Sequence, residues 1–408
     1  MNIVMRHLRT LCILLSMLSL SSSCQSQIHQ YNPNFEISAR NFCDTIPIEI
    51  EDDQIYLNVE IQGRRYRFNL DTGSSQGMVF RGDFLRSCKE LGNIISRDAN
   101  NHLDTVKVVQ MPSFRLGKIR ISGYVASLMP RPSVSNKYDA IIGFDLFNRG
   151  LCAKIDARRK LLILSDRKKI FDYESGYTLK YKLKWFVPYV TVSPFIRHDD
   201  QALFDLGSKS LYSMSKQSFD EHVVKDLSRL SRPLGADIQR QVEGRTVGQM
   251  SIGGHGAEQR GEVVFLKLDR LKWGEFAFED LRTMTTQGAS RIGAELLRYG
   301  NVIINPFKKT ITFQPFTISD RVTIGNKPMR VAFVPRGNKA TVGLVHPQSD
   351  AYKAGLRSGD TILQIDDREI RTFQQFLSFP FVEGRNYDFT VKDLKGNIKH
   401  VEMSRWGE

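Results

Sequence analysis

The feature of this sequence that most constrains its fold is a short motif that occurs twice. Asp71-Thr72-Gly73 follows the apolar run Phe68-Asn69-Leu70, and a weaker copy, Asp205-Leu206-Gly207, follows Ala202-Leu203-Phe204. Two carboxylates at equivalent positions predict a paired-carboxylate site. Like charges about 3 Å apart cannot both ionise, so one carboxyl group stays protonated as an acid while the other acts as a base.

Each copy is followed, after a long insert, by a second shared pattern. Ile141-Ile142-Gly143-Phe144-Asp145-Leu146 follows the first copy, and Arg291-Ile292-Gly293-Ala294-Glu295-Leu296 follows the second copy. In both halves a basic turn and a further apolar strand come next. Self-similarity in the same order predicts two related lobes in one chain.

At these residues the chain resembles the pepsin-like and retropepsin-like aspartic proteases, in the branch of bacterial lipoproteins with an added PDZ domain. The resemblance implies a mainly β fold, with bilobal aspartic-protease-like β-barrel lobes over residues 46–170 and 171–318. It implies that Asp71 and Asp205 are catalytic, and that the supporting residues are Thr72, Gly73, Ser74, Gly207 and Ser208. Thr72 is expected to bridge the lobes, and the hydroxyls of Ser74 and Ser208 to support the outer carboxylate oxygens.

The implied activity is that of an aspartic endopeptidase, in which a water held between Asp71 and Asp205 attacks the peptide carbonyl. Leu206 departs from the family pattern, because leucine cannot donate the hydrogen bond of a threonine or serine. A catalytically silent peptide-binding scaffold is therefore the alternative function. A serine hydrolase is the remote alternative, because Gly73-Ser74-Ser75-Gln76-Gly77 fits G-x-S-x-G with Ser75 as the nucleophile.

The second insert contains a glycine-rich stretch, Gly248 to Gly256. Such a stretch is typical of a hairpin tip that closes over a substrate cleft as a flap. It is equally typical of a surface loop, since glycine-rich tips are common.

The C-terminal segment, residues 319–408, resembles an α+β PDZ domain in the run from Ser349 to Ile365. PDZ domains add a peptide to a sheet edge, so a peptide ligand is expected in its groove. The loop expected to hold the peptide carboxylate lies near Met329-Arg330-Val331-Ala332-Phe333, and a role in packing alone is the other interpretation.

Residues 1–23 are interpreted as a signal peptide and residues 24–45 as a linker. Arg6 and Arg9 precede an apolar stretch that is short for a membrane span, and the ending before Cys24 resembles a lipoprotein signal. Cys24 is then the lipidated residue and anchors an exported protein to a membrane of the cell envelope. Ordinary secretory cleavage near Ser23 is the alternative.

Export makes Cys43, Cys88 and Cys152 candidates for one disulfide, or for three free thiols. No zinc-protease His-Glu-x-x-His pattern occurs, and neither a metal nor a cofactor is expected. The net charge of +14 comes from dispersed basic residues, which favours solvated turns over a nucleic-acid surface. The expected partner is a peptide or protein substrate, and the expected state is a monomer.

Overall fold

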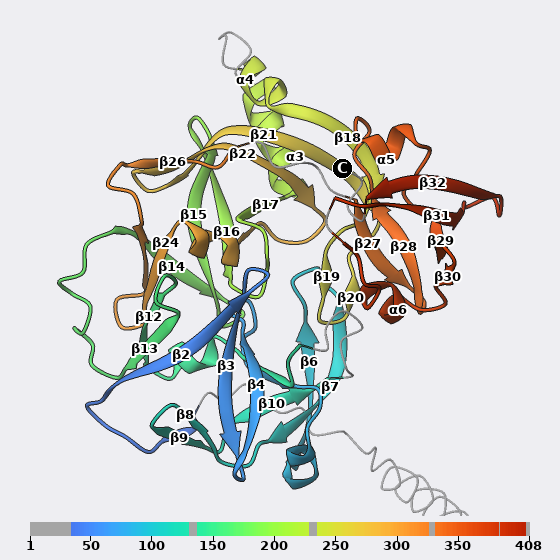
Figure 1. The fold of residues 1–408 in the computed structure, drawn as a ribbon. Helices are drawn as coiled ribbons and strands as arrows, with labels where there is room; N and C mark the ends of the chain where they lie inside the picture. Colours follow the sequence, from blue (N-terminus) through green and yellow to red (C-terminus); the bar gives the residue numbers. More distant parts are fainter. Residues whose placement is uncertain (1–33, 130–136, 228–234, 326–330, 383, 405–408) are drawn as a thin grey trace, which may run out of the picture.

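The structure, a computed structural model, describes residues 34–129, 137–227, 235–325, 331–382 and 384–404. Strands dominate it, and the predicted fold class is confirmed: two β-rich lobes are followed by a smaller α+β domain (Figure 1). The interpretations of residues 1–23 and of Cys24 lie outside the described residues. No helix in the described ranges has both the length and the apolar character needed to cross a membrane.

The first lobe is built around a hairpin that leads to Asp71. In β3 (Gln54–Ile61) and β4 (Arg64–Leu70) the apolar side chains are buried, and Tyr56 lies opposite Asn69 in the register. Beside β4 runs β11 (Ala140–Ile142) in parallel. The other elements are β1 (Glu36–Ile37), β2 (Cys43–Glu51), β5 (Gly77–Val79), η1 (Asp83–Ser87), β6 (Lys89–Arg97), β7 (Leu103–Gln110), β8 (Phe114–Leu116), β9 (Ile119–Ser122), β10 (Val125–Leu128) and α2 (Asp145–Asn148).

The second lobe repeats this plan. The hairpin of β15 (Val187–Phe195) and β16 (His198–Asp205) leads to Asp205, and β23 (Arg291–Gly293) runs parallel to β16. The other elements are β14 (Tyr177–Lys184), β17 (Tyr212–Ser215), α3 (Lys216–Leu227), α4 (Gly235–Arg240), β18 (Val242–Gly248), β19 (Ile252–Gly253), β20 (Gly256–Ala257), β21 (Gly261–Trp273), β22 (Phe276–Thr286), η2 (Ala294–Arg298) and β26 (Arg321–Thr323). Because β26 pairs with β22, this lobe continues past the boundary expected at residue 318.

One antiparallel sheet joins the two lobes. Its strand order is β2, β13 (Leu161–Ser165), β12 (Cys152–Asp156), β24 (Gly300–Asn305), β25 (Thr310–Pro315) and β14. A single hydrophobic core runs through both lobes from this sheet. The lobes therefore fold as one unit, and the two aspartates are held at their junction. Cys43, Cys88 and Cys152 are free thiols, which is one of the two alternatives that the sequence left open.

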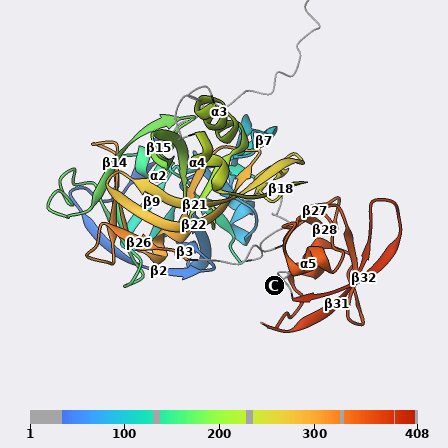
Figure 2. The same ribbon diagram turned by 90° about the horizontal axis from the view of Figure 1, so that it is seen from above.

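The C-terminal domain has its own core and lies beside the second lobe (Figure 2). Its elements are β27 (Ala332–Arg336), β28 (Lys339–Leu344), α5 (Asp350–Lys353), β29 (Thr361–Ile365), β30 (Arg368–Glu369), α6 (Phe373–Leu377), β31 (Asn386–Lys392) and β32 (Ile398–Ser404). The Gln249 N–H donates to the Gly343 carbonyl at 2.9 Å, and Leu344 packs with Val263 and Phe265 of β21. The domain is thus docked on the long insert that follows Asp205 in the second lobe.

Candidate active site

The two Asp-x-Gly turns lie face to face. A Cβ added at Gly73 would lie 2.5 Å from the carboxyl carbon of Asp205, and a Cβ added at Gly207 would lie 2.5 Å from that of Asp71. Real Cβ atoms do not approach other atoms so closely, so only glycine fits either place. Each turn therefore packs directly against the carboxylate of the other lobe, and four of the predicted site residues meet at one point.

The two carboxyl groups form a coupled pair. The Asp205 carboxyl group is a hydrogen-bond partner of the Asp71 carboxyl group. The Gly73 N–H donates to Asp71 Oδ1 at 2.8 Å, and the Gly207 N–H donates to Asp205 Oδ1 at 3.0 Å. Desolvation, followed by the charge and the hydrogen bond of Asp205, raises the pKa of Asp71 well above its ordinary value. The pair is therefore arranged to hold one proton between two carboxylates.

Thr72 bridges the lobes, as expected, but from one side. Its Oγ1 donates to the Phe204 carbonyl at 2.7 Å and accepts from the Leu206 N–H at 2.9 Å. Leu206 occupies the equivalent position in the second lobe, where its side chain is fully buried in the shared core. The polar bridge of the first lobe is thus matched by an apolar contact in the second lobe.

Ser74 and Ser208 support the aspartates mainly through their backbone. The Ser208 N–H donates to Asp205 Oδ1 at 3.2 Å, and the Ser74 N–H bonds to the Asp71 carboxylate. The Ser74 hydroxyl donates instead to the Gln76 carbonyl at 2.7 Å. The expectation of hydroxyl support was therefore wrong for Ser74, because its hydroxyl donates its hydrogen bond to a backbone carbonyl instead of the carboxylate.

Gly143 and Gly293, the glycines of the second shared pattern, are called the landmark glycines below. They let a parallel strand pass close behind each turn. The Ser74 carbonyl accepts from the Phe144 N–H at 2.7 Å, and the Ser208 carbonyl accepts from the Ala294 N–H at 2.8 Å. A Cβ at Gly143 would lie 2.7 Å from the Ser74 carbonyl oxygen, and one at Gly293 would overlap the Ser210 carbonyl. Both turns are consequently fixed from behind by the same contact.

The acid that follows each landmark glycine also has an equivalent task. Asp145 accepts a hydrogen bond from the Gly77 N–H, and Glu295 accepts one from the Leu211 N–H at 3.0 Å. Gly77 and Leu211 stand at the same distance along the chain from their respective aspartates. Sequence reasoning found both acids but gave them no role. They anchor the segment that leaves each turn.

The tip of the β6–β7 hairpin crosses from the first lobe to the second. Arg291, whose side chain is buried beside the turn of Asp205, donates from Nη1 to Ser251 Oγ at 2.9 Å and from Nη2 to Asn100 Oδ1 at 2.9 Å. The His255 N–H donates to Asp98 Oδ2 at 3.1 Å. A buried guanidinium group therefore holds the hairpin tip of one lobe against a hairpin of the other lobe.

The stretch from Gly248 to Gly256, considered above as a flap or a surface loop, forms β19, β20 and their approach. It lies between the β6–β7 tip and the C-terminal domain, against whose core Ile252 packs (Figure 1). Sequence reasoning missed the β6–β7 hairpin because its tip carries no glycine run. The available signal was the turn-forming stretch from Asp98 to Asn101 between two strand-like segments.

Two tyrosines lie within electrostatic range of the carboxylate pair. Desolvation and then the charge of Asp71 raise the pKa of Tyr138. Desolvation also raises the pKa of Tyr189, on which Arg291, Asp205 and Arg97 act electrostatically. Both phenols therefore stay protonated and remain available as hydrogen-bond donors near the pair.

The serine-elbow alternative has no structural support. A nucleophile elbow requires a helix directly after the serine. Here Ser75 is followed by β5, whose Met78 pairs with Ile141. Within the described ranges no group of three or more histidine, cysteine or acidic side chains is arranged to bind a metal ion.

Comparison with known proteins bears on the C-terminal domain and on the lobes. A family model described as a PDZ domain matches residues 341–379. The C-terminal domain is a PDZ domain. In it Ser349 caps α5 by accepting from the Tyr352 N–H, and Ala351 packs against the core. The part of the expected carboxylate loop formed by Met329 and Arg330 lies outside the described residues.

The lobes are similar to the aspartic proteinase from Irpex lacteus, with 10% identity and a TM-score of 0.43 over 68% of this chain and 99% of that one. They are also similar to basic 7S globulin from soybean, with 8% identity and a TM-score of 0.38 over 67% and 94% of the two chains. Conglutin gamma, a basic 7S globulin from lupine seeds, has 11% identity and a TM-score of 0.40 over 67% and 95%. None of the curated proteins matches the sequence. Activity is therefore argued from geometry.

Proposed function

We propose that the protein is an aspartic endopeptidase. The observation that carries this proposal is the contact of the Asp71 and Asp205 carboxyl groups, each packed against the glycine of the opposite turn. Two carboxyl groups in such contact share a proton. Burying two acids side by side costs folding free energy, and such pairs are found mainly at functional sites. The mainly β bilobal fold supplies the frame that aims them at each other.

In the proposed reaction a water binds between the two carboxyl groups. One carboxylate removes a proton from this water as its oxygen attacks the peptide carbonyl carbon, and the other carboxyl group protonates the carbonyl oxygen. Collapse of the tetrahedral intermediate then breaks the C–N bond, and the amine leaves with a proton from the pair. The pair titrates together, so the proton belongs to the two carboxyl groups jointly.

Substitution of each aspartate tests this proposal. Asp71→Asn and Asp205→Asn should each abolish cleavage of a peptide library, because an amide cannot transfer the proton. Ser75→Ala is the control and should keep most of the activity. If both Asp→Asn variants cleave like the wild type, the proposal is wrong, and loss of activity in Ser75→Ala alone would instead support a serine hydrolase.

A silent peptide-binding scaffold is the second candidate. The one-sided bridge at Thr72 and Leu206 favours it, because the Leu206 side chain cannot return to the first turn the hydrogen bonds that Thr72 makes with the second turn. Such a scaffold binds peptides with equal affinity whether or not both aspartates are changed to asparagine, and it cleaves none. Titration calorimetry of the wild type and both variants with a statine-type transition-state mimic separates the two functions.

We further propose that the protein is a bacterial lipoprotein of the cell envelope, exported by residues 1–23 and anchored through Cys24, with a peptide ligand at its PDZ domain. The support is the sequence pattern before Cys24 and the general mode of PDZ binding. Cys24→Ala should move the protein from the membrane fraction to the soluble fraction, because the acyl chains supply most of the membrane affinity. Unchanged fractionation would indicate ordinary secretory cleavage.

A further inference from the structure

Two hairpin turns in the lobes have the same unusual backbone. In the described residues, only Asp52–Asp53 and Trp185–Phe186 are consecutive non-glycine residues at positive φ, with values of 50° and 59° and of 53° and 66°. The turns are equivalent in the two lobes. Each ends three residues before a tyrosine, Tyr56 or Tyr189, that pairs with the residue two positions before the candidate catalytic aspartate.

Each turn also touches the other lobe at an equivalent place. The Arg298 guanidinium group donates from Nη2 to Asp53 Oδ2 at 2.7 Å, and the Asn148 side chain donates to the Phe186 carbonyl at 2.9 Å. Arg298 and Asn148 occupy matching positions after their landmark glycines. The duplicated architecture therefore requires this backbone in both lobes, but it does not dictate the side chains.

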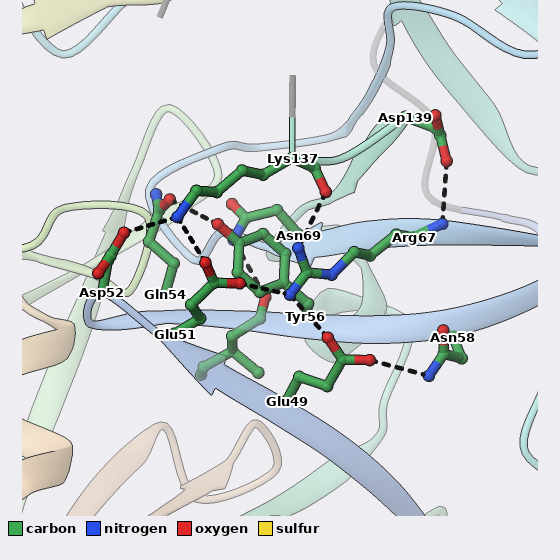
Figure 3. Close-up of polar contacts among 11 residues, drawn as sticks. Glu49, Glu51, Asp52, Gln54, Tyr56, Asn58, Arg67, Asn69, Lys137 and Asp139 are labelled. Carbon is green, nitrogen blue, oxygen red and sulfur yellow. Dashed lines mark hydrogen bonds and ion pairs between the residues drawn. The ribbon is translucent and has the colours of Figure 1, made fainter. Parts of the chain in front are cut away.

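The side chains of the first turn suit its backbone. Aspartate tolerates positive φ better than bulky residues do. Both carboxylates are also paired. Asp52 pairs with the Lys137 ammonium group at 2.6 Å (Figure 3), and Asp53 pairs with Arg298. The first turn is thus explained by its own contacts.

The side chains of the second turn do not suit its backbone. A two-residue hairpin with positive φ at both positions favours Asn-Gly, and aromatic residues are disfavoured there. Burial gives no compensation, because 72% of Trp185 and 49% of Phe186 remains exposed. Residues held in such conformations cluster at functional sites. The aromatic pair therefore calls for an explanation outside the folded chain.

The position of the turn suggests that explanation. Arg97, at the end of β6, places its guanidinium carbon 5.3 Å from the centre of the Trp185 ring, so Trp185 faces the hairpin that crosses between the lobes. Tyr189 follows on the same hairpin, interacts electrostatically with Arg97 and Asp205, and has the Lys184 ammonium group 4.8 Å above its ring. Because Tyr189 pairs with Leu203, two residues before Asp205, the row from the exposed Trp185 to Tyr189 leads toward the turn of Asp205.

We propose that Trp185 and Phe186 form a specificity site that binds a bulky apolar side chain of the peptide substrate, at the outer end of the site that contains Asp71 and Asp205. The identity of the bound peptide as a substrate rests on the proposed function. Exposed tryptophan and phenylalanine rings supply large apolar contact area at little entropic cost. The cationic groups of Arg97 and Lys184 beside this row disfavour a basic side chain there.

The test uses the full chain with Trp185→Asn and Phe186→Gly combined, a pair that suits the turn. The melting temperature should rise by about 2 °C or more, because strain is relieved. With peptide series that carry Phe, Gly or Lys at one position at a time, one position should show a preference for Phe in the wild type. In the double variant, kcat/KM for the Phe peptide should fall about tenfold, to the level of the Gly peptide. Tyr173→Asn, which changes a fully exposed aromatic residue elsewhere, is the matched control and should change neither quantity.

Binding in an Asp205→Asn background gives a readout that does not need catalysis. The Phe peptide should shift Trp185 fluorescence to shorter wavelength, and Trp185→Phe should remove this shift. If the Phe peptide shifts the fluorescence but is never cleaved by the wild type, the endopeptidase proposal fails and the aromatic site stands. The site is refuted if the double variant keeps the wild-type ratio of Phe to Gly peptides in both cleavage and binding.

Discussion

The two lobes present the same carboxylate turn, yet they secure it differently. In the first lobe the Thr72 side chain joins the turn to the other lobe through two hydrogen bonds, whereas in the second lobe the Leu206 side chain fills the core and forms no hydrogen bond. The turns agree in the contacts that exclude any other residue, which are the glycines facing the opposite carboxylates. The two lobes therefore share the glycines that the close contact requires. They differ at the residue after the aspartate, where apolar packing can take the place of a hydrogen bond.

The largest effect should come from breaking the shared feature. Gly73→Ala and Gly207→Ala should each lower kcat/KM by more than about 100-fold, because the new methyl group displaces the opposite carboxylate from its reactive geometry. Peptide cleavage and thermal melting measure the two consequences. Gly254→Ala is the control, since a Cβ there meets only ordinary contacts at 3.8 Å and beyond. Equal activity in all three variants would contradict the packing of each turn against the other.

The buried acid Asp145, behind the turn of Asp71, should make the stability of the folded protein depend on pH. Burial raises the pKa of Asp145 to about 7, against the hydrogen bond from Tyr124. The folded protein therefore binds this proton more tightly than the unfolded chain does, and stability falls as the pH rises from about 4 through about 7.

Asp145→Asn should remove this loss, which is about 2 kcal/mol between pH 5 and pH 7. Urea unfolding at both pH values measures it. Tyr124→Phe should make the pH dependence steeper, because the hydrogen bond that favours the charged form is lost. A pH slope that is the same in the wild type and both variants would mean that Asp145 does not titrate in this range.

Thr72 and Leu206 occupy equivalent positions, but only the Thr72 side chain makes hydrogen bonds between the lobes. Substitutions at the two positions should therefore have different effects. Thr72→Val removes both hydrogen bonds and leaves the buried Phe204 carbonyl and Leu206 N–H unsatisfied, at a cost of about 1 to 3 kcal/mol in the free energy of unfolding. Leu206→Thr should hold or raise activity by restoring a hydroxyl, although it loses apolar burial. Unfolding by urea and peptide cleavage give the two readouts. If Leu206→Thr lost activity and Thr72→Val did not, Leu206 and not Thr72 would be the residue that supports the site at this position.

The smallest effect concerns the PDZ domain, which only the second lobe carries. His346 packs its ring 4.3 Å from that of Phe265 at the domain contact, and burial lowers its pKa, while Glu243 and Arg282 act on it in opposite directions. The free energy of docking should thus be independent of pH well above about pH 6.5 and should become less favourable as the pH falls below it, because the undocked imidazole binds the proton more readily.

Small-angle scattering at pH 7.5 and pH 5 should show a modest increase in the radius of gyration at the lower pH. His346→Phe should abolish the increase. His400→Gln, at an exposed histidine of the same domain, should leave it unchanged. An increase that persists in His346→Phe would assign the pH dependence to another group.

Sequence patterns were sufficient for the elements whose physics is local. The apolar runs before Asp71 and Asp205 lie in strands, and the repeated order of motifs predicted two lobes. The helix and turn signals from Ser349 to Ile365 located the PDZ domain. The Ser74 hydroxyl was assigned wrongly, because it donates to the Gln76 carbonyl only two residues away. The β6–β7 tip was missed because its partners, Ser251 and Arg291, lie far along the chain.

The two equivalent aspartate turns follow from the order of amino acids alone, since strand periodicity, glycine positions and duplication are all present in neighbouring residues. The contact of Gly73 with Asp205, of Arg291 with the tip of the β6–β7 hairpin and of Arg97 with the Trp185 ring exists only in the folded chain. These contacts join residues that are distant in the chain. Their geometry depends on how the two lobes pack across the shared sheet, which no local pattern encodes.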